Sequence, residues 1–354
     1  IIRHNPKASN ALYYLGNIWY DKRQYAEAIS AWETSIQIND TFPTVLRNLA
    51  LAYFNKLGRK EEAVNLLEKA YALDTSDARL LMELDQLHKR MNYDHNQRFN
   101  FLNQHKEIVT LRDDLYLEYA TLLNQLGRYE EAIQWIDARK FHPWEGGEGK
   151  VTAQYQLARL ELVKQYMKEG RYEEALTRIN ECYVYPHHLG EGKQGAQEND
   201  FNYYKGCILD AMGRTAEAKT CWEAATQGNR QPAAAMYYND QKPDKIFYQG
   251  LALLKLGRTD EAKGRFHALI DYGEKHLFDI FKMDYFAVSL PDLQIWEDDM
   301  DKKNVIHCNY LMGLGHLGLG ETAAAQTYLE EAYRLDNNHQ GVQSHLQEIE
   351  KRSF

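Results

Sequence analysis

The chain has 354 residues, of which 26% are charged and 44% hydrophobic, a balance typical of a folded globular protein. Its 42 Lys and Arg against 51 Asp and Glu give a net charge of −9 without a basic stripe, so nucleic acid is not an expected partner. Its apolar runs are interrupted well before the roughly 18 residues that a membrane span requires, so no membrane contact is expected.

The first residues, IIRHNPKAS, lack an initiator Met and read like the end of one helix followed by a turn. This start indicates a piece of a longer protein. The four cysteines are widely spaced and form no CxxC pair, which favours free thiols over a zinc site or a disulfide framework. No cofactor is expected.

An eight-residue pattern returns along the chain. Its copies, in chain order, are LGRKEEAV (57–64), LGRYEEAI (126–133), EGRYEEAL (169–176), MGRTAEAK (212–219), LGRTDEAK (256–263) and LGETAAAQ (319–326). A small residue precedes several copies, as at Gly16, Ala50, Gly206, Gly250 and Gly313. A large apolar residue lies four positions after the alanine of the pattern, as at Trp32, Leu67, Ile136, Trp222, Phe266 and Leu329. Internal periodicity of this kind predicts a repeat architecture.

Each element of the pattern suits a helical hairpin. The glycine before Arg is favourable at the left-handed position that ends a helix. Glu-Glu-Ala opens the next helix with negative charge near its positive end. The small residue and the alanine allow two helices to cross closely. We therefore expect antiparallel helical pairs.

The pattern resembles the tetratricopeptide repeat, a helical hairpin of about 34 residues. The resemblance implies an all-α fold, a right-handed α-solenoid of about eight hairpins with inserted loops. Residues 1–140 would hold four repeats. The third of these, around 78–106, departs from the pattern at Asp85 and Gln97. Residues 141–354 would hold four more, with long loop insertions at 141–150, 185–198, 228–244 and 277–304. The last stretch, HQGVQSHLQEIEKRSF, would be a capping helix, and the whole is expected to be one continuous solenoid.

A solenoid of this type binds on its concave face, which the first helix of each pair lines. The residues predicted to project there are mostly aromatic, and the candidate groove set is Tyr13, Tyr14, Asn17, Asn48, Tyr203, Tyr204, Phe247, Tyr248 and Tyr310. Tyr suits both peptide anchoring and sugar stacking. The alternative is that many of these rings pack between neighbouring helices.

The carboxylate clamp of chaperone-binding tetratricopeptide domains is only half matched. Asn17 and Asn48 correspond to its asparagines and Arg79 can stand for one lysine, but Tyr13 and Glu83 occupy the other basic positions. A glutamate there would repel a ligand carboxylate, so chaperone tails are not expected partners.

Two long insertions share a sequence: FHPWEGGEGK (141–150) and YPHHLGEGKQGAQ (185–197). Neither is a P-loop, because Trp144 and His187 stand where that motif needs glycine. Adjacent histidines also lack the i, i+4 ligand spacing of a helix, so no metal site is expected. We expect both loops to leave one edge of the solenoid and form a rim beside the groove. Lys150 and Lys193 would each bond a carbonyl or a carboxylate of the neighbouring loop, including Glu148 or Glu191. The candidate rim set is His142, Trp144, Glu148, Lys150, His187, His188, Glu191 and Lys193.

Insertions of this form are similar to those in the C-terminal repeat region of large bacterial proteins that carry an N-terminal β-rich domain of unknown function. The resemblance implies a setting among carbohydrate-utilising bacteria. We expect a non-catalytic protein-interaction or scaffold module of a larger bacterial protein. Its partner would be a protein or peptide, including the N-terminal domain of the same protein, and a cytoplasmic location is favoured.

Two alternatives remain open. One is a carbohydrate-binding or carbohydrate-processing accessory module; catalysis would require two carboxylates about 5–9.5 Å apart, and the candidates near the loops are Glu145, Glu148, Glu191, Glu198 and Asp200. The other is self-association through the solenoid end at Ile1–Ile2.

Overall fold

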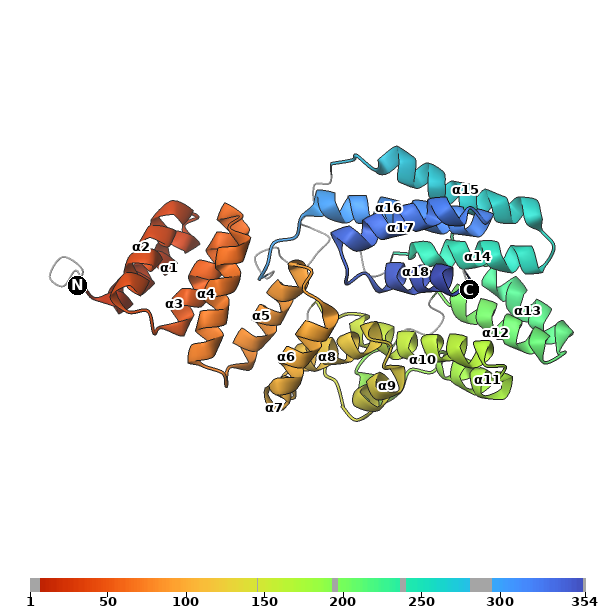
Figure 1. Ribbon diagram of the computed structural model, residues 1–354, viewed down its shortest axis with the longest axis horizontal. Helices are drawn as coiled ribbons and strands as arrows, with labels where there is room; N and C mark the ends of the chain where they lie inside the picture. The colour runs from red at the N-terminus through yellow and green to blue at the C-terminus, as the bar shows by residue number, and fades with distance from the viewer. Residues whose placement is uncertain (1–6, 145, 193–196, 236–239, 281–294, 353–354) are drawn as a thin grey trace. The chain divides into compact units, whose positions relative to one another are not determined.

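The computed structural model describes residues 7–144, 146–192, 197–235, 240–280 and 295–352, and every regular element in these ranges is a helix (Figure 1). The first half contains α1 (Ser9–Asp21), α2 (Tyr25–Ile38), α3 (Pro43–Ala52) with its π-helical extension η1 (Tyr53–Leu57), α4 (Lys60–Leu73), α5 (Ala78–Arg90), α6 (His95–Gln104), α7 (Lys106–Val109), α8 (Asp113–Gln125) and α9 (Tyr129–Asp137). The second contains α10 (Lys150–Lys168), α11 (Tyr172–Glu181), the 3₁₀ turn η2 (His187–Leu189), α12 (Asn199–Ala211), α13 (Thr215–Ala225), α14 (Pro243–Lys255), α15 (Thr259–His276), α16 (Met300–Leu319), α17 (Thr322–Leu335) and α18 (Gln340–Arg352). The predicted all-α fold of consecutive helical pairs is confirmed.

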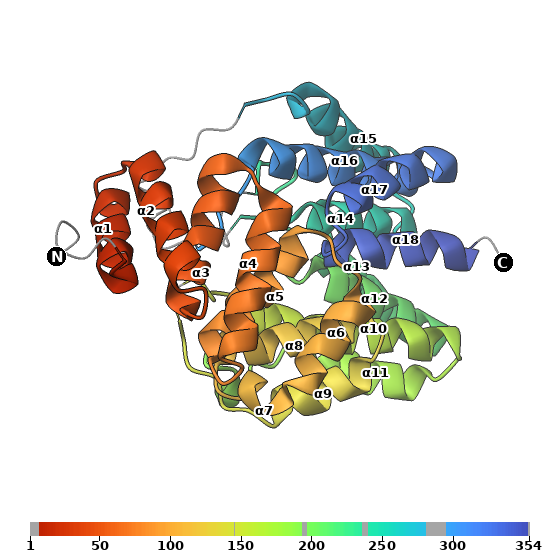
Figure 2. The ribbon, with the colours of Figure 1, turned by 60° about the vertical axis from the view of Figure 1, so that its left-hand side comes forward.

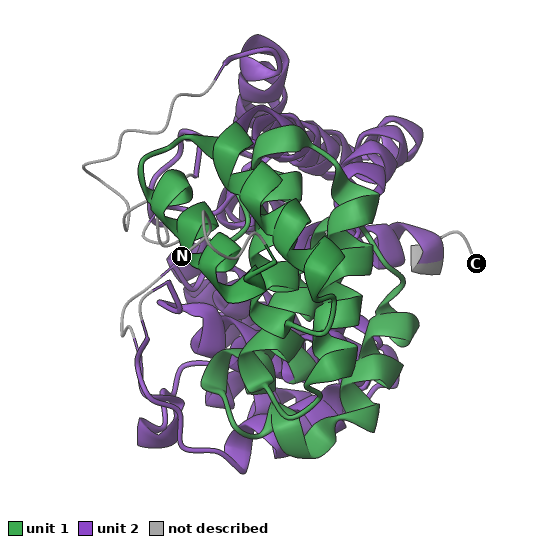
Figure 3. Ribbon diagram, turned by 90° about the vertical axis from the view of Figure 1, so that its left-hand side faces the viewer, with its two compact units in different colours: residues 1–119, 290–298 green, residues 120–289, 299–354 purple. Residues whose placement is uncertain are grey.

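The chain forms two compact units (Figure 3). Unit 1 comprises Ile1–Tyr119 with Leu290–Asp298, and unit 2 comprises Ala120–Ser289 with Asp299–Phe354. The division falls inside α8, upstream of the sequence-based boundary at residue 140. No helix in the described ranges is both long and apolar enough to cross a lipid bilayer.

Within a pair, the small residue of the first helix faces the large residue of the second, as the repeat pattern predicts. A Cβ added at Gly206 on α12 would overlap the indole of Trp222 on α13, and one added at Gly250 on α14 would overlap the ring of Phe266 on α15. Both aromatic side chains are buried. Glycine at these positions therefore lets each aromatic ring pack directly against the backbone of its partner helix.

Gly250→Ala should accordingly destabilise unit 2 by about 1–3 kcal/mol, the usual cost of overpacking a core. Gly264 supplies the matched control, because it lies on the exposed face of α15 with open space around its Cα. Gly264→Ala should leave the free energy of unfolding unchanged or raise it by about 0.5–1 kcal/mol through helix propensity. Urea unfolding of both variants measures the difference; equal effects would contradict the packing argument.

The turn within five of the helical pairs uses the Gly-Arg-x-x-Glu sequence. Gly127 has a left-handed backbone, with φ 72°, and the next residue, Arg128, is the N-cap of α9. The Arg128 guanidinium donates to both carboxylate oxygens of Glu131, at 2.7 and 2.6 Å. The same Arg–Glu pairing recurs at the start of four further second helices, at Arg59–Glu62, Arg171–Glu174, Arg214–Glu217 and Arg258–Glu261.

The third pair, α5 and α6, replaces the small residue with a buried ion cluster. Asp85 and Arg98 are 1% and 0% exposed and lie 2.7 Å apart, and Arg98 also reaches Glu118 of α8 at 2.7 Å. Lys89 binds the same Glu118 at 2.9 Å. Burial would raise the pKa of Glu118, but the charges of Lys89 and Arg98 outweigh burial and hold that pKa at about 2. The sequence degeneracy of this repeat thus coincides with a change from close apolar packing to charge pairing.

The described residues of the second segment of unit 1, 295–298, pack against the helices of that unit. Trp296 is 1% exposed, its ring lies edge-on to Phe54 at 5.2 Å, and its Nε1 donates to the Glu83 carbonyl at 3.1 Å. Trp296 is therefore part of the core of unit 1. Phe278 is exposed, whereas Phe281, Tyr285 and Phe286 lie outside the described residues.

Candidate functional site

The C-terminal helix α18 packs on α17, as expected for a cap, and it also lies along the first helices of the other pairs in unit 2 (Figures 1 and 2). Gln343 donates to the carbonyl of Gln125 at the end of α8, at 2.7 Å. Gln340 and Gln154 of α10 exchange side-chain hydrogen bonds at 2.8 and 2.9 Å. The face predicted to bind a ligand is therefore covered in part by the chain itself.

A polar network fixes α18 to α10 and α12. Lys164 of α10 lies 2.7 Å from Glu161 and 2.9 Å from Glu348 of α18, and it donates to the Ser344 hydroxyl at 2.9 Å. The hydroxyl of Tyr204 on α12 donates to Glu348 at 3.1 Å. Burial opposes ionisation of Glu348, yet the Lys164 charge prevails and lowers its pKa to about 2. Glu348 therefore remains ionised at neutral pH and anchors the middle of α18.

Aromatic contacts fix the N-terminal half of α18 to α14 and α16. The imidazole of His345 lies edge-on to Phe247 at 5.3 Å and 5.8 Å from the Tyr310 ring. Tyr248 packs between Tyr203 and Tyr204, at 5.7 and 5.6 Å. These five groove candidates thus form one aromatic cluster on the first helices, with α18 against it.

Beside α18 an open cleft of about 820 Å³ remains in unit 2. Groove candidates Tyr248 and Tyr310 line it together with rim candidates Glu148 and Glu191. The structure therefore brings members of both predicted sets to one site. Sequence reasoning missed the contribution of α18, which supplies Gln340, Gly341, Ser344 and His345 to the wall.

The described lining of the cleft is acidic. Its six carboxylates are Glu148, Glu161, Glu191, Asp200, Asp240 and Asp244, and its three lysines are Lys164, Lys242 and Lys245. Lys245 lies 2.6 Å from Asp200 in a buried pair. Burial opposes the Lys245 charge, but Asp200 and Asp244 outweigh burial and raise its pKa. Burial lowers the pKa values of His307 and His339, which keeps both rings neutral at pH 7 and leaves the acids in excess.

One buried group in this wall lacks a partner among the described residues. His345 is 3% exposed, its Nδ1 lies 2.7 Å from the Gly341 carbonyl, and its Nε2 makes no hydrogen bond. Because a carbonyl can only accept, Nδ1 donates in this contact. A buried polar atom without a hydrogen bond, such as Nε2, is expected to find a partner.

The two insertion loops contact each other through the backbone of one and the carboxylate of the other. Glu191 accepts from the backbone N–H groups of Gly149 and Thr152, at 2.7 and 2.9 Å, and so caps the N-terminus of α10. The Phe141 N–H donates to the His188 carbonyl at 2.8 Å. The contacts predicted for Lys150 and Lys193 with the neighbouring loop stay predictions, and Lys193 lies outside the described residues.

A second recess of about 340 Å³ lies between the loops. His142, Trp144, Glu148 and Glu191 line it. A Cβ on Gly147 would overlap the Trp144 indole, so the ring lies directly on the loop backbone. His187 and His188 do not line either space in unit 2; the His188 ring faces Asp137, with Nε2 3.4 Å from its carboxylate.

The groove candidates of unit 1 form a separate polar ladder. Asn17 accepts from Asn48 and from the Trp32 indole, both at 3.2 Å. The buried carboxylate of Glu83 lies between Arg47 at 2.6 Å and Arg79 at 2.8 Å. An internal carboxylate therefore engages the basic groups next to these asparagines. Tyr13 packs between Tyr14 and Phe42, and Tyr14 is 63% exposed.

Sequence models of one family match four segments that coincide with these helical pairs. Models described as "Tetratricopeptide repeat" match residues 9–42, 45–77, 246–272 and 306–339. The chain contains tetratricopeptide repeats. They cover the first, second, seventh and eighth pairs, and the tetratricopeptide repeat architecture is that of a protein-interaction scaffold.

Comparison with solved structures gives matches at low identity and with TM-scores below 0.5. YrrB, a TPR protein with an unusual peptide-binding site, is 13% identical, with a TM-score of 0.38 over 63% of this chain and 95% of YrrB. A tetratricopeptide repeat protein from Parabacteroides merdae is 14% identical, with a TM-score of 0.42 over 73% of this chain and 91% of its own. The Naa15/Naa10 complex bound to HypK-THB gives 13% identity and a TM-score of 0.43, over 99% of this chain and 62% of that one.

Proposed function

We propose that this chain is a non-catalytic interaction module of a larger protein and that the acidic cleft of unit 2 binds a peptide segment carrying Lys or Arg. The observation that supports it best is that members of both predicted sets, Glu148 and Glu191 with Tyr248 and Tyr310, line one cleft. Tyr and a carboxylate together suit a basic side chain, since the ring covers its alkyl stem and the acid pairs with its charge.

The carboxylates of the cleft support a ligand that donates hydrogen bonds. They outnumber the lysines of its described lining by six to three. Lys, Arg and a peptide N–H are all donors. An acidic segment would instead face like charges at Glu148 and Asp244.

Binding can be measured by fluorescence polarisation with two hexapeptide libraries, one with Lys or Arg and one with Asp or Glu at fixed positions. We expect only the basic library to bind, and its affinity to fall as salt rises because the charges at the mouth are screened. Glu148→Lys should weaken binding by about fivefold. Glu130→Lys on α9 is the matched control, because Glu130 is exposed and does not line the cleft.

Preference for the acidic library, or equal effects of the two charge reversals, would contradict the proposal. The carbohydrate-binding alternative is tested in the same assay with neutral oligosaccharides as competitors. It gains support only if they bind wild type with no salt dependence while both peptide libraries fail.

A further inference from the structure

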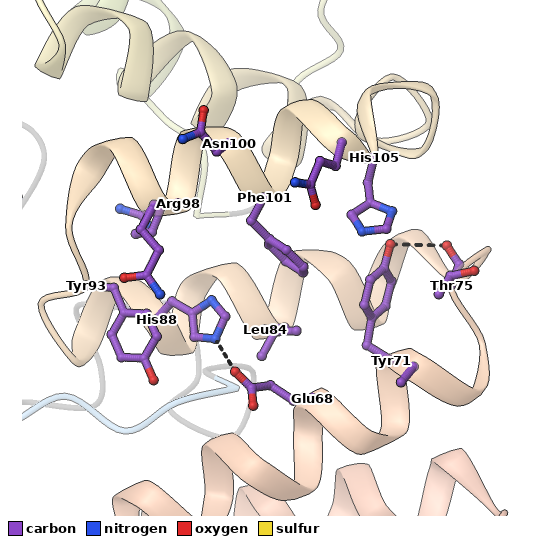
Figure 4. A pocket seen from close by; sticks show the side chains of 13 residues that line it. Glu68, Tyr71, Thr75, Leu84, His88, Tyr93, Arg98, Asn100, Phe101 and His105 are labelled. Atoms are coloured by element: carbon purple, nitrogen blue, oxygen red, sulfur yellow. Dashed lines mark hydrogen bonds and ion pairs between the residues drawn. The ribbon is translucent and has the colours of Figure 1, made fainter.

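A second pocket lies wholly within unit 1, among α4, α5 and α6, and has a volume of about 620 Å³ (Figure 4). Five rings line it, and they are Tyr71, His88, Tyr93, Phe101 and His105. Leu84 contributes an apolar side chain and Glu68 a carboxylate. No residue of the acidic cleft takes part in this pocket.

Phe101 and Tyr71 meet neighbouring rings at steep angles. Phe101 lies edge-on to Tyr71 at 5.9 Å and to His88 at 5.8 Å, and Tyr71 lies edge-on to His105 at 5.1 Å. His88 stacks on Tyr93 at 4.5 Å. The Tyr71 hydroxyl donates to the Thr75 carbonyl at 3.2 Å, which fixes its ring. Rings at steep mutual angles present faces in several directions, as in the aromatic cages that recognise quaternary ammonium groups.

A carboxylate, that of Glu68, lies in the wall of this pocket. Glu68 is half exposed, and its Oε1 lies 3.3 Å from His88 Nε2, which orients the carboxylate (Figure 4). Burial, followed by the charges of Glu68 and Glu61, raises the pKa of the Tyr93 hydroxyl. Arg98 also lines the pocket, but its guanidinium is paired with Asp85 and Glu118. Glu68 therefore adds a carboxylate that the Arg98 charge does not balance.

The two histidines support the same interpretation. Burial lowers the pKa values of His88 and His105, so neither ring adds a positive charge at neutral pH. A neutral imidazole can face a cation without repulsion. The pocket also coincides with the degraded repeat, where Gln97 replaces the alanine of the other second helices and lines the opening.

We propose that this pocket binds a compact organic cation of the quaternary or tertiary ammonium class, with its alkyl groups against the rings and Glu68 as counter-charge. The ligand chemistry could come from a free alkylammonium compound or from a methylated lysine side chain of a protein. The proposal stands apart from peptide binding in unit 2, because the two sites share no residue.

The test is titration calorimetry of the whole chain with choline and with 3,3-dimethylbutan-1-ol, its neutral isostere. We expect choline to bind about tenfold more tightly, the preference that cation–π contact and one carboxylate give. Glu68→Gln and Phe101→Leu should each weaken choline binding several-fold. Glu27→Gln, an exposed acid on α2, and Phe278→Leu, an exposed ring after α15, are the matched controls and should leave it unchanged.

Equal affinity for the neutral isostere would overturn the proposal, as would failure of both compounds to bind wild type with an intact circular dichroism spectrum. A trimethyllysine peptide and its unmodified lysine form distinguish the sources. Tighter binding of the methylated peptide than of choline assigns the site to a protein partner, and the reverse order assigns it to a free ammonium compound.

Discussion

Arg98→Met should lower the free energy of unfolding by about 3–5 kcal/mol, because it leaves Asp85 buried and ionisable without a counter-charge. Asp85 and Arg98 are 1% and 0% exposed, so water cannot replace the lost partner. Burial already raises the Asp85 pKa in the presence of Arg98. Urea unfolding followed by circular dichroism at pH 7 measures the loss.

Two variants give this experiment its control. Arg334→Met removes an exposed arginine paired with Glu331 and should cost at most about 1 kcal/mol. The double variant Asp85→Ala/Arg98→Met removes both buried charges and restores a small residue where the other repeats have one. It should recover most of the loss, since replacing both members of a buried pair is often neutral. A double variant as unstable as Arg98→Met would show that the charges are not the cause.

Lys164→Met should detach α18 from unit 2 and cost about 3 kcal/mol, because Glu161 and Glu348 would then share a largely buried site without a cation. Hydrogen exchange of the α18 amides is the direct measurement, and we expect their protection to fall more than that of α12 or α14. Lys168→Met, an exposed position one turn further along α10, should leave α18 protected. Equal protection in both variants would contradict the anchoring role of Lys164.

The ion pair between Lys164 and Glu348 also makes the stability of the protein depend on pH, with a sign that follows from the Glu348 pKa. The pKa of Glu348 is about 2 in the folded protein, below its ordinary value of 4.5. A carboxyl with a lowered folded-state pKa stabilises the protein above its unfolded value and loses that contribution as pH falls through the folded value. Stability should therefore decline between about pH 4.5 and 2 in wild type, and Lys164→Met should reduce the slope in this range.

Much of the fold could be predicted because the helical pair is a local unit with a regular pattern. Gly206 and Trp222 are separated by one turn and face each other in the structure, as their spacing implies. The third repeat could be recognised in the sequence only because it departs from that pattern. Asp85 at a small position was visible in the sequence, but its counter-charge, Arg98, could be identified only once α5 and α6 were placed.

The site was harder to predict because its decisive contacts join distant residues. A helix with Gln, Ser, His and Glu reads as a solvated cap, and only the positions of Lys164 and Tyr204 show that its polar side chains have partners. The role of Glu191 was missed for another reason. Its donors are main-chain N–H groups at the start of α10, which no side-chain pattern reports.

The position of α18 changes the cooperativity expected of unit 2. A linear array contacts only its neighbours, so its repeats can unfold one after another from either end. Here a single helix bonds to Gln125, 218 residues earlier, and also to residues of α10, α12 and α16. Opening any one of these pairs therefore also breaks contacts with the helix that joins the others. Because α18 links helices that are far apart in the sequence, we expect unit 2 to unfold in one all-or-none transition, as a globular domain does.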